Sequence, residues 1–365
     1  MVVALDRWRG ALAAALLVVG AASAATAQES RLQAAPTEGG EAGLAAGTLL
    51  VANRSGGSIS MFDLAAGLEI ARLPIGPAIP HEVAVSPDGR WAVTGEYGSN
   101  DDPGRRVVVI DVENARITGR IDLGPVSRPH SFAFLPDGRR VAATMERADR
   151  IAVVDIVALA VLRTYPTGGR EGHMVRLSPD GAYAYVTSRG AEGTLSVISL
   201  REDVPPIVIP TGAGAEGLAV SADGTEVWVV NRAAGSISVV NAATLEVVAT
   251  LPARMGAGRA EISAGGRVLV PNGSAGAATE RYLTVYDLAA RRVAGELAID
   301  AGREGPGAFG IHIVGERAFV ADRAARSIAL YDLATLTLLG TLATAHPDPD
   351  GLAFTPVRIG AMERQ

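Results

Sequence analysis

The stretch HEVAVSPDGRWAVTGEYG, residues 81–98, contains the pattern that decides the fold of this chain. Apolar and polar residues alternate before Asp88-Gly89 and a second aliphatic run follows, which predicts two antiparallel strands joined by a tight turn. The pattern returns as HSFAFLPDGRRVAATMER (130–147), HMVRLSPDGAYAYVTSRG (173–190) and EGLAVSADGTEVWVVNRA (216–233). A repeat of roughly 40 to 50 residues with four strands in each copy is typical of a β-propeller, in which every copy forms one blade.

The signals for the first, second and third strands of the repeat each occur seven times, so the sequence predicts an all-β, seven-bladed β-propeller. The inner strand of each blade is expected at His81–Ser86, His130–Leu135, His173–Ser178, Glu216–Ser221, Gly258–Ser263, Phe309–Val314 and Asp350–Thr355. The third strands are expected to end at Asp63, Asp111, Asp155, Ser199, Asn241, Asp287 and Asp332. Most of these side chains can accept hydrogen bonds from the following backbone, which favours a turn into the outer strand.

The two ends of the repeat array do not match. It begins with a second strand at Thr48 and finishes with an inner strand at Asp350–Thr355. We therefore expect the C-terminal strand to complete the N-terminal blade, which removes two open sheet edges at the seam. The predicted organisation is a signal peptide (1–27), a disordered leader (28–46), the propeller (47–356) and a C-terminal tail (357–365).

The N-terminus has the features of a secretory signal peptide. Arg7 and Arg9 precede an apolar run over residues 11–22, and Ala25 and Ala27 form a cleavage pattern that predicts a cut after Ala27. A retained membrane anchor is the alternative. We expect a periplasmic or secreted protein with no integral membrane segment after cleavage.

Composition excludes several chemistries. The chain contains no cysteine, and all its basic residues are arginine, so it offers neither a thiolate nucleophile nor a lysine for a Schiff base. No nucleophile elbow, P-loop or dinucleotide fingerprint occurs. Loss of Arg7, Arg9 and Asp6 with the signal changes the formal charge from −6 to −7. An acidic chain with 4% aromatic residues does not favour nucleic acid as a partner.

Several segments resemble the YVTN-type β-propeller repeat proteins, in particular the YncE-like family. The resemblance rests on P-x-x-x-A-x-S-P-D-G at Pro80–Gly89, on aliphatic strands ending in asparagine at Val51–Asn53 and Val229–Asn231, and on Ser236–Asn241. It covers nearly the whole mature chain and implies a propeller fold. Similar propellers include lactonases, haem-binding reductase domains and dehydrogenase subunits, so the resemblance does not choose a function.

Superposition of the repeats predicts which side chains meet at one mouth of the central channel. The first residues of the inner strands are His81, His130, His173, Glu216, Gly258, Phe309 and Asp350. The residues just past the second strands are Arg54, Glu96, Glu146, Arg189, Arg232, Gly273 and Arg323. Three imidazoles beside carboxylates suit a divalent transition metal, so His81, His130 and His173 are candidate metal ligands. The alternative is a set of polar residues tolerated in a wet channel.

The other residues of this mouth are candidates for roles of two kinds. Glu96 and Glu146 are candidate general bases for a metal-bound water. The candidate ligand-binding residues are Glu216, Arg54, Arg189, Arg232, Arg323 and Asp350. The long loops 97–105, 274–281 and 301–307 are expected on the same face, either as part of a site or as plain length variation. His346 lies in the connection to this rim, and His312 is expected to be a packed structural histidine.

Three functions remain open from the sequence. The favoured one is a ligand- or partner-binding scaffold, whose partner is a small molecule or an envelope protein. The second is a metal-dependent hydrolase of the lactonase kind. The third is a redox accessory protein in which one rim histidine ligates a haem-like group. The arginines of the rim would then form ion pairs with the carboxylates of that group. A divalent metal ion is the cofactor that the rim residues suit.

Overall fold

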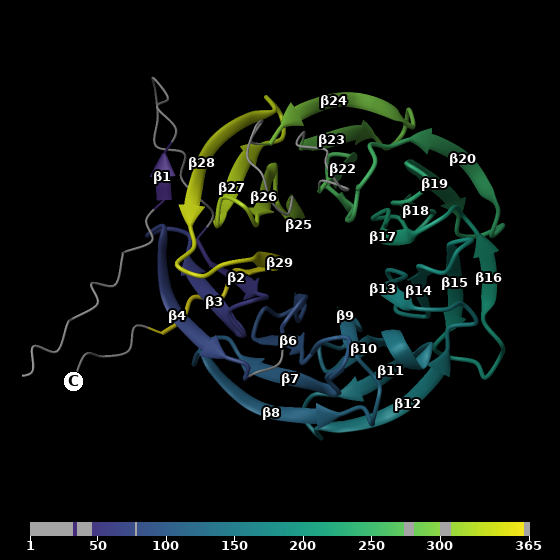
Figure 1. Ribbon diagram of the computed structural model, residues 1–365, viewed down its shortest axis with the longest axis horizontal. Helices are drawn as coiled ribbons and strands as arrows, with labels where there is room; N and C mark the ends of the chain where they lie inside the picture. Colours follow the sequence, from purple (N-terminus) through teal and green to yellow (C-terminus); the bar gives the residue numbers. More distant parts are fainter. Residues whose placement is uncertain (1–31, 35–45, 77–78, 274–280, 300–307, 361–365) are drawn as a thin grey trace, which may run out of the picture.

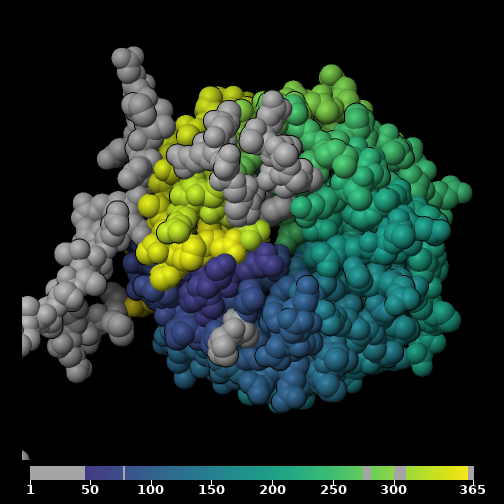
Figure 2. Space-filling view, in the orientation of Figure 1, coloured from purple at the N-terminus to yellow at the C-terminus, as the bar shows by residue number. Residues whose placement is uncertain are grey.

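The computed structural model describes residues 32–34, 46–76, 79–273, 281–299 and 308–360. Seven antiparallel sheets, six with four strands and one with five in the described residues, are arranged in a ring around a central axis, which confirms the predicted seven-bladed β-propeller (Figure 1). The space-filling view shows the blades packed side by side around this ring (Figure 2). No helix in the described ranges is long and apolar enough to cross a membrane.

Every blade runs from an inner strand at the central axis to an outer strand at the periphery of the propeller. Blades 1 to 4 are β29 (Pro349–Thr355), β2 (Thr48–Asn53), β3 (Ser58–Asp63), β4 (Leu68–Pro74); β5 (Val83–Val85), β6 (Trp91–Gly95), β7 (Arg106–Asp111), β8 (Arg116–Asp122); β9 (Pro129–Phe134), β10 (Arg140–Met145), β11 (Arg150–Asp155), β12 (Ala160–Pro166); β13 (Gly172–Leu177), β14 (Tyr183–Ser188), β15 (Thr194–Ser199), β16 (Ile207–Pro210). Blades 5 to 7 are β17 (Ala215–Val220), β18 (Glu226–Asn231), β19 (Ser236–Asn241), β20 (Val247–Pro252); β21 (Glu261–Ile262), β22 (Arg267–Pro271), β23 (Tyr282–Asp287), β24 (Arg292–Ala298); β25 (Ala308–Val314), β26 (Arg317–Asp322), β27 (Ser327–Asp332), β28 (Thr337–Ala343).

The C-terminal strand closes the ring as predicted. Strand β29 pairs with β2 in antiparallel register, with Leu49 opposite Phe354 and Val51 opposite Leu352. The first blade therefore takes its inner strand from the end of the chain and its other three strands from the beginning (Figure 1). Thr48 Oγ1 also donates a hydrogen bond to the carbonyl of Val357 at 2.8 Å, which ties the start of the predicted tail to this blade.

The ends of the third strands confirm the predicted turn chemistry. All seven third strands end at the expected residue, from Asp63 in β3 to Asp332 in β27. Asp63 Oδ1 accepts hydrogen bonds from the backbone N–H groups of Ala65 and Ala66, at 2.9 and 3.2 Å. These bonds satisfy backbone donors in the turn and direct the chain into the outer strand.

The apolar core lies between blades. Seven hydrophobic clusters are present among the described residues, and each combines side chains from two neighbouring blades. Trp228 of blade 5, for example, is fully buried and contacts Tyr286 of blade 6 edge-to-face, with ring centroids 6.2 Å apart. Because each blade is stabilised by its neighbours, a break in the ring leaves two apolar faces uncovered.

Three regions differ from the sequence prediction. Strand β5 spans only Val83–Val85, within the expected His81–Ser86. Leu32–Ala34, inside the segment expected to be a disordered leader, forms a short strand β1 that pairs with the outer edge of β28. An outer strand offers unpaired backbone groups, and an extended segment can bind them. Strand β21 is also much shorter than Gly258–Ser263, because the chain around Gly256 and Gly258 makes only isolated bonds to blade 6 before Glu261. The predicted signal peptide and the loops 274–280 and 301–307 lie outside the described residues.

Candidate functional site

Three histidines from three consecutive blades meet at one mouth of the channel, as predicted. The rings of His130 and His173 stack with centroids 3.9 Å apart, and the rings of His81 and His130 are 4.4 Å apart. Each residue lies at or just before the start of its inner strand, and these starts gather at the same end of the axis. We call His81, His130, His173 and the acidic and basic groups that contact them the histidine rim.

His130 occupies the middle of this row and has no exposed surface. Its Nδ1 lies 3.2 Å from the backbone carbonyl of His173. Because a carbonyl only accepts, this contact assigns the proton to Nδ1 and leaves Nε2 with a free lone pair. Nε2 is buried and has no hydrogen-bond partner within the described chain. Burial, followed by the neighbouring His173 and His81, holds the pKa of His130 well below its usual value, so the ring is neutral.

Glu146 is the carboxylate most closely surrounded by the rim. It begins a short 3₁₀ turn, Glu146–Ala148, directly after β10, and only 3% of it is exposed. Its Oε1 accepts a 2.6 Å hydrogen bond from Arg189, and its Oε2 lies 3.5 Å from His173 Nδ1. Burial alone would raise the pKa of Glu146, but His173, Arg189 and Arg128 outweigh burial and hold the pKa at about 2.

A second carboxylate lies on the opposite side of His173. Glu216 Oε1 is 3.3 Å from His173 Nε2 and 3.2 Å from Arg232. Burial opposes ionisation of Glu216, but His173, Arg259 and Arg232 outweigh it and lower the pKa. Neither ring nitrogen of His173 makes an aligned hydrogen bond, although both are buried and each lies near a carboxylate.

His81, at the other end of the row, faces two more acids. Its Nδ1 lies 3.3 Å from Asp350, which comes from the closing strand β29, and 3.5 Å from Glu82. Glu82 in turn forms an ion pair with Arg259 of blade 6. Burial raises the pKa of Glu82, but Arg259 and His81 more than offset it and hold the pKa at about 2.

Four residues of this site were missed by the sequence analysis: Tyr97, Arg128, Glu82 and Arg259. The Tyr97 ring packs 5.0 Å from His81 and 5.1 Å from His130, and its hydroxyl donates to Glu146 at 3.2 Å. Burial, followed by the Glu146 charge, raises the pKa of Tyr97 to about 12. Arg128 stacks on the other side of this ring, with its guanidinium carbon 4.1 Å from the centroid. A detectable signal was that Glu82 and Arg128 stand within two residues of a rim histidine in sequence.

Three predicted site residues lie elsewhere. Glu96 pairs with Arg120 of β8 at 3.1 Å, outside the rim. Its backbone N–H continues the ladder to Arg106, whereas the chain at Glu146 bends into its 3₁₀ turn, and this difference directs the two side chains to different places. Arg54 and Arg323 gather around Asp348, a residue absent from the candidate list.

The rim brings together two sets of atoms suited to a cation. One set is His81, Glu82 and His130, and the other is His130, Glu146 and His173; within each set the ligand atoms lie within 4.8 Å of one another. Tetrahedral ligands at metal distances of about 2.0–2.2 Å are separated by about 3.4 Å, so each set would have to contract by roughly an ångström to close on an ion. The two sets share His130.

The comparisons with known proteins agree with the fold. A family model described as YNCE-like beta-propeller matches residues 198–305. The seven-bladed beta-propeller protein Rv1057 of Mycobacterium tuberculosis is 28% identical over 135 residues, which are 36% of this chain. The match spans about a third of that relative's length, 32%.

Solved structures with low sequence identity share the architecture. Hydrazine synthase of Kuenenia stuttgartiensis aligns with a TM-score of 0.62 at 19% identity, covering 73% of this chain and 86% of that one. A functionally unknown protein of Desulfotomaculum acetoxidans gives 0.68 at 15%, covering 85% and 99%. A putative 6-phosphogluconolactonase of Bacteroides fragilis gives 0.64 at 16%, covering 87% and 100%. At these identities the likeness shows the fold alone. The chain is a seven-bladed β-propeller, and over residues 198–305 it matches the YNCE-like propeller family.

Proposed function

We propose that this chain is a ligand-binding propeller and that the ligand of its histidine rim is a divalent transition-metal ion. One observation carries the proposal: His130 belongs to both ligand sets, and its Nε2 is buried, deprotonated and without a hydrogen-bond partner among the described residues. A buried acceptor without a partner is costly. Imidazole and carboxylate together suit Zn²⁺, Mn²⁺, Fe²⁺ or Co²⁺, and binding would satisfy this lone pair.

The charges of the rim favour binding over hydrolysis. A general base works best when its pKa lies near the working pH, and Glu146, with a pKa of about 2 and two arginines, is a weak base. Glu96 lies with Arg120 and Arg106, away from the histidines. His130, Glu146 and His173 are each at most 3% exposed, which suits a small ion better than a substrate or a haem.

Metal analysis of the purified chain tests this function. The protein, stripped with a chelator and dialysed, is titrated with Mn²⁺, Co²⁺, Ni²⁺, Cu²⁺ and Zn²⁺ and followed by calorimetry and elemental analysis. We expect about one tightly bound ion per chain, and Co²⁺ to give visible absorption bands typical of imidazole ligation. The His130→Ala substitution should abolish binding of this ion, because both ligand sets include His130.

The matched control is His312→Ala, which removes a histidine that pairs with Glu261 outside the rim. This variant should bind metal as the unmodified chain does. A folded apo chain that binds none of the five ions stoichiometrically, or equal binding by the His130→Ala and His312→Ala variants, would overturn the proposal.

We also propose that the chain is exported. The charged, apolar and small-residue segments within residues 1–27 support this location. N-terminal sequencing of protein recovered from a cell envelope fraction should begin at Gln28. A chain recovered with residue 1 intact would contradict the proposal.

A further inference from the structure

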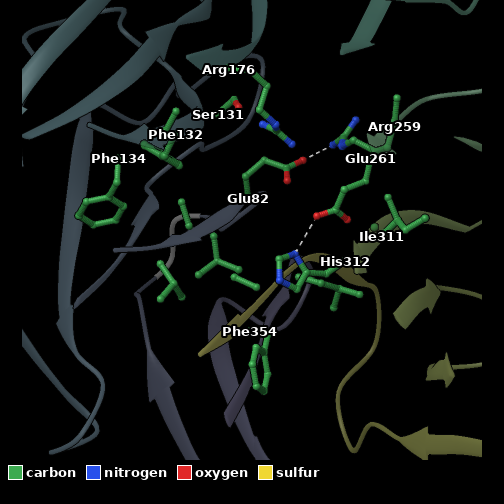
Figure 3. A pocket seen from close by; sticks show the side chains of 18 of the residues that line it. Glu82, Ser131, Phe132, Phe134, Arg176, Arg259, Glu261, Ile311, His312 and Phe354 are labelled. Carbon is green, nitrogen blue, oxygen red and sulfur yellow. Dashed lines mark hydrogen bonds and ion pairs between the residues drawn. The ribbon is translucent and has the colours of Figure 1, made fainter. Parts of the chain in front are cut away.

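The central channel contains a cavity of about 280 Å³ that begins next to the rim and runs along the inner strands. Its lining comes from six blades, through inner strands β5, β9, β13, β25 and β29 and the segment at β21. Figure 3 shows charged side chains and aromatic side chains lining the same space. Pockets for small molecules span about 300–1,000 Å³, so this cavity suits a ligand at the small end of that range.

Most of the charges in the cavity are already paired. Glu82 binds Arg259, and Glu261 Oε1 lies 3.2 Å from His312 Nδ1; both contacts are drawn in Figure 3. These pairs leave the carboxylates of the cavity with cationic or imidazole partners. His312, expected from the sequence to be a packed structural residue, thus lines a cavity and is a quarter exposed.

Arg176 is the exception. In the part of the chain that the structure describes, no carboxylate lies within 4.0 Å of its guanidinium, and its one hydrogen bond goes to the neighbouring carbonyl of Val175 at 2.9 Å. A guanidinium has five N–H donors, so four remain without a hydrogen-bond partner among the described residues. Burial lowers the pKa of Arg176, and the more distant Glu261 and Glu82 offset this effect only in part.

A second polar group with a free donor lies nearby. Ser131 Oγ lines the cavity and accepts a hydrogen bond from the backbone N–H of Val175 at 3.2 Å. Its own hydrogen is therefore available for a ligand acceptor. Arg176 and Ser131 come from adjacent inner strands, β13 and β9, so both donors can reach one anionic group.

Apolar side chains form part of the remaining wall. Phe132, Phe134, Ile311 and Phe354 are among the residues that line the cavity, and in Figure 3 Phe354 lies on the side away from Arg176. A small inorganic anion would contact the arginine but leave these side chains unused. A ligand that has an anionic head and an apolar body matches both parts.

We infer that the channel cavity binds a small organic carboxylate, with the carboxylate on Arg176 and Ser131 and the apolar body along Phe132, Phe134, Ile311 and Phe354. Arginine holds a carboxylate by two parallel hydrogen bonds, which gives orientation as well as affinity. Arg176 and Ser131 are not among the proposed metal ligands of the rim, although Glu82 lines the cavity and belongs to one ligand set, and the test does not require metal.

Calorimetry on the full chain tests the inference with four probes: benzoate, hexanoate, the neutral analogue benzamide, and inorganic phosphate. Benzoate and hexanoate should bind one per chain, and benzamide at least tenfold more weakly because it cannot form the charged pair. Arg176→Gln should weaken carboxylate binding by about ten- to a hundredfold. The control Arg201→Gln, which removes an exposed arginine paired with Asp180, should leave the affinity unchanged.

A second variant guards against a folding defect. Ala133→Leu fills the cavity from β9 while leaving Arg176 in place, and it should block both carboxylates. The inference is overturned if neither carboxylate binds at about 10 mM, if benzamide binds as tightly as benzoate, or if phosphate competes as well as hexanoate. It is equally overturned if a folded Ala133→Leu chain binds both carboxylates with unchanged affinity.

Discussion

His130 donates its Nδ1 hydrogen to the backbone carbonyl of His173, and the two imidazoles stack with centroids 3.9 Å apart. This arrangement fixes which nitrogen of His130 carries the proton, and it places an uncharged, fully buried ring against a second buried ring. A proton added to His130 would therefore be buried without a partner.

The first prediction concerns pH. The pKa of His130 is well below its usual value in the folded chain, whereas the unfolded chain binds the proton near pH 6.5. Stability from His130 is thus complete above pH 6.5 and falls as the pH drops below it, by up to about 1.4 kcal/mol per pH unit. Urea unfolding between pH 7.5 and 5.0 measures this slope.

The controls for the pH prediction separate the contribution of His130 to the pH dependence of stability from the contributions of the carboxylates and the other histidines. His130→Gln should flatten the slope between pH 6.5 and 5.0, and His312→Gln should not. The rim carboxylates, Glu146 and Glu82, have pKa values of about 2 and contribute their loss of stability mainly below pH 4.5. An equal slope in the unmodified chain and the His130→Gln variant would contradict this account.

The second prediction concerns ring closure. Removal of residues 349–365 deletes β29, which leaves β2 with an open edge and uncovers the apolar contacts of Leu352 and Ala353. We expect the thermal midpoint to fall by roughly 10 °C or more. Removal of only residues 361–365 is the control and should leave the melt unchanged. A melt that ignores the loss of β29 would be incompatible with closure by this strand.

The third prediction concerns the buried ion pair of Glu82 and Arg259, whose side chains are 13% and 6% exposed. Arg259→Met leaves a buried carboxylate without its partner and should cost about 3–5 kcal/mol in the free energy of unfolding. Glu82→Met combined with Arg259→Met should recover much of this loss, because both charges are then absent. A double-mutant cycle by urea unfolding measures the coupling, and strictly additive effects would rule the pair out as a coupled unit.

The fourth prediction concerns Gly310 of β25. A Cβ at this position would lie 1.7 Å from the carbonyl oxygen of Asp350, so any side chain must push β25 away from the closing strand. Gly310→Ala should destabilise the fold by about 3 kcal/mol or more. Gly190→Ala is the control, since its new Cβ would meet nothing closer than 3.9 Å. Chemical denaturation of both variants compares them; equal midpoints would refute the close approach.

The repeat predicted the fold well because it records local chemistry. Asp63 and its counterparts end the third strands at the expected residue, since the side chain itself caps the turn. Strands β5 and β21 are shorter than the ranges that the repeat predicted for them. The pairing of β1 with β28 was not predictable, because Leu32–Ala34 carries no repeat pattern.

The site was predictable only at positions that the repeat aligns. His81, His130 and His173 occupy equivalent places in three blades, so superposition of the copies brought them together correctly. Glu82 and Arg259 align with each other one residue past the rim position, and Tyr97 directly follows Glu96, so a comparison limited to the first residue of each strand misses them. Glu96 aligns with Glu146 in sequence, yet one extra ladder bond at its backbone sends it to Arg120.

The pairing of β29 with β2 also determines when blade 1 can be completed during synthesis of the chain. A ribosome makes Thr48–Asn53 before the other six blades and Pro349–Thr355 after them, so blade 1 has only three strands until those six blades have been made. Contacts between such distant segments form slowly, and an incomplete ring leaves pairing edges open in the meantime. Ring closure is therefore a late step in folding. A metal ion or carboxylate ligand that needs the closed channel can bind only after β29 has paired with β2.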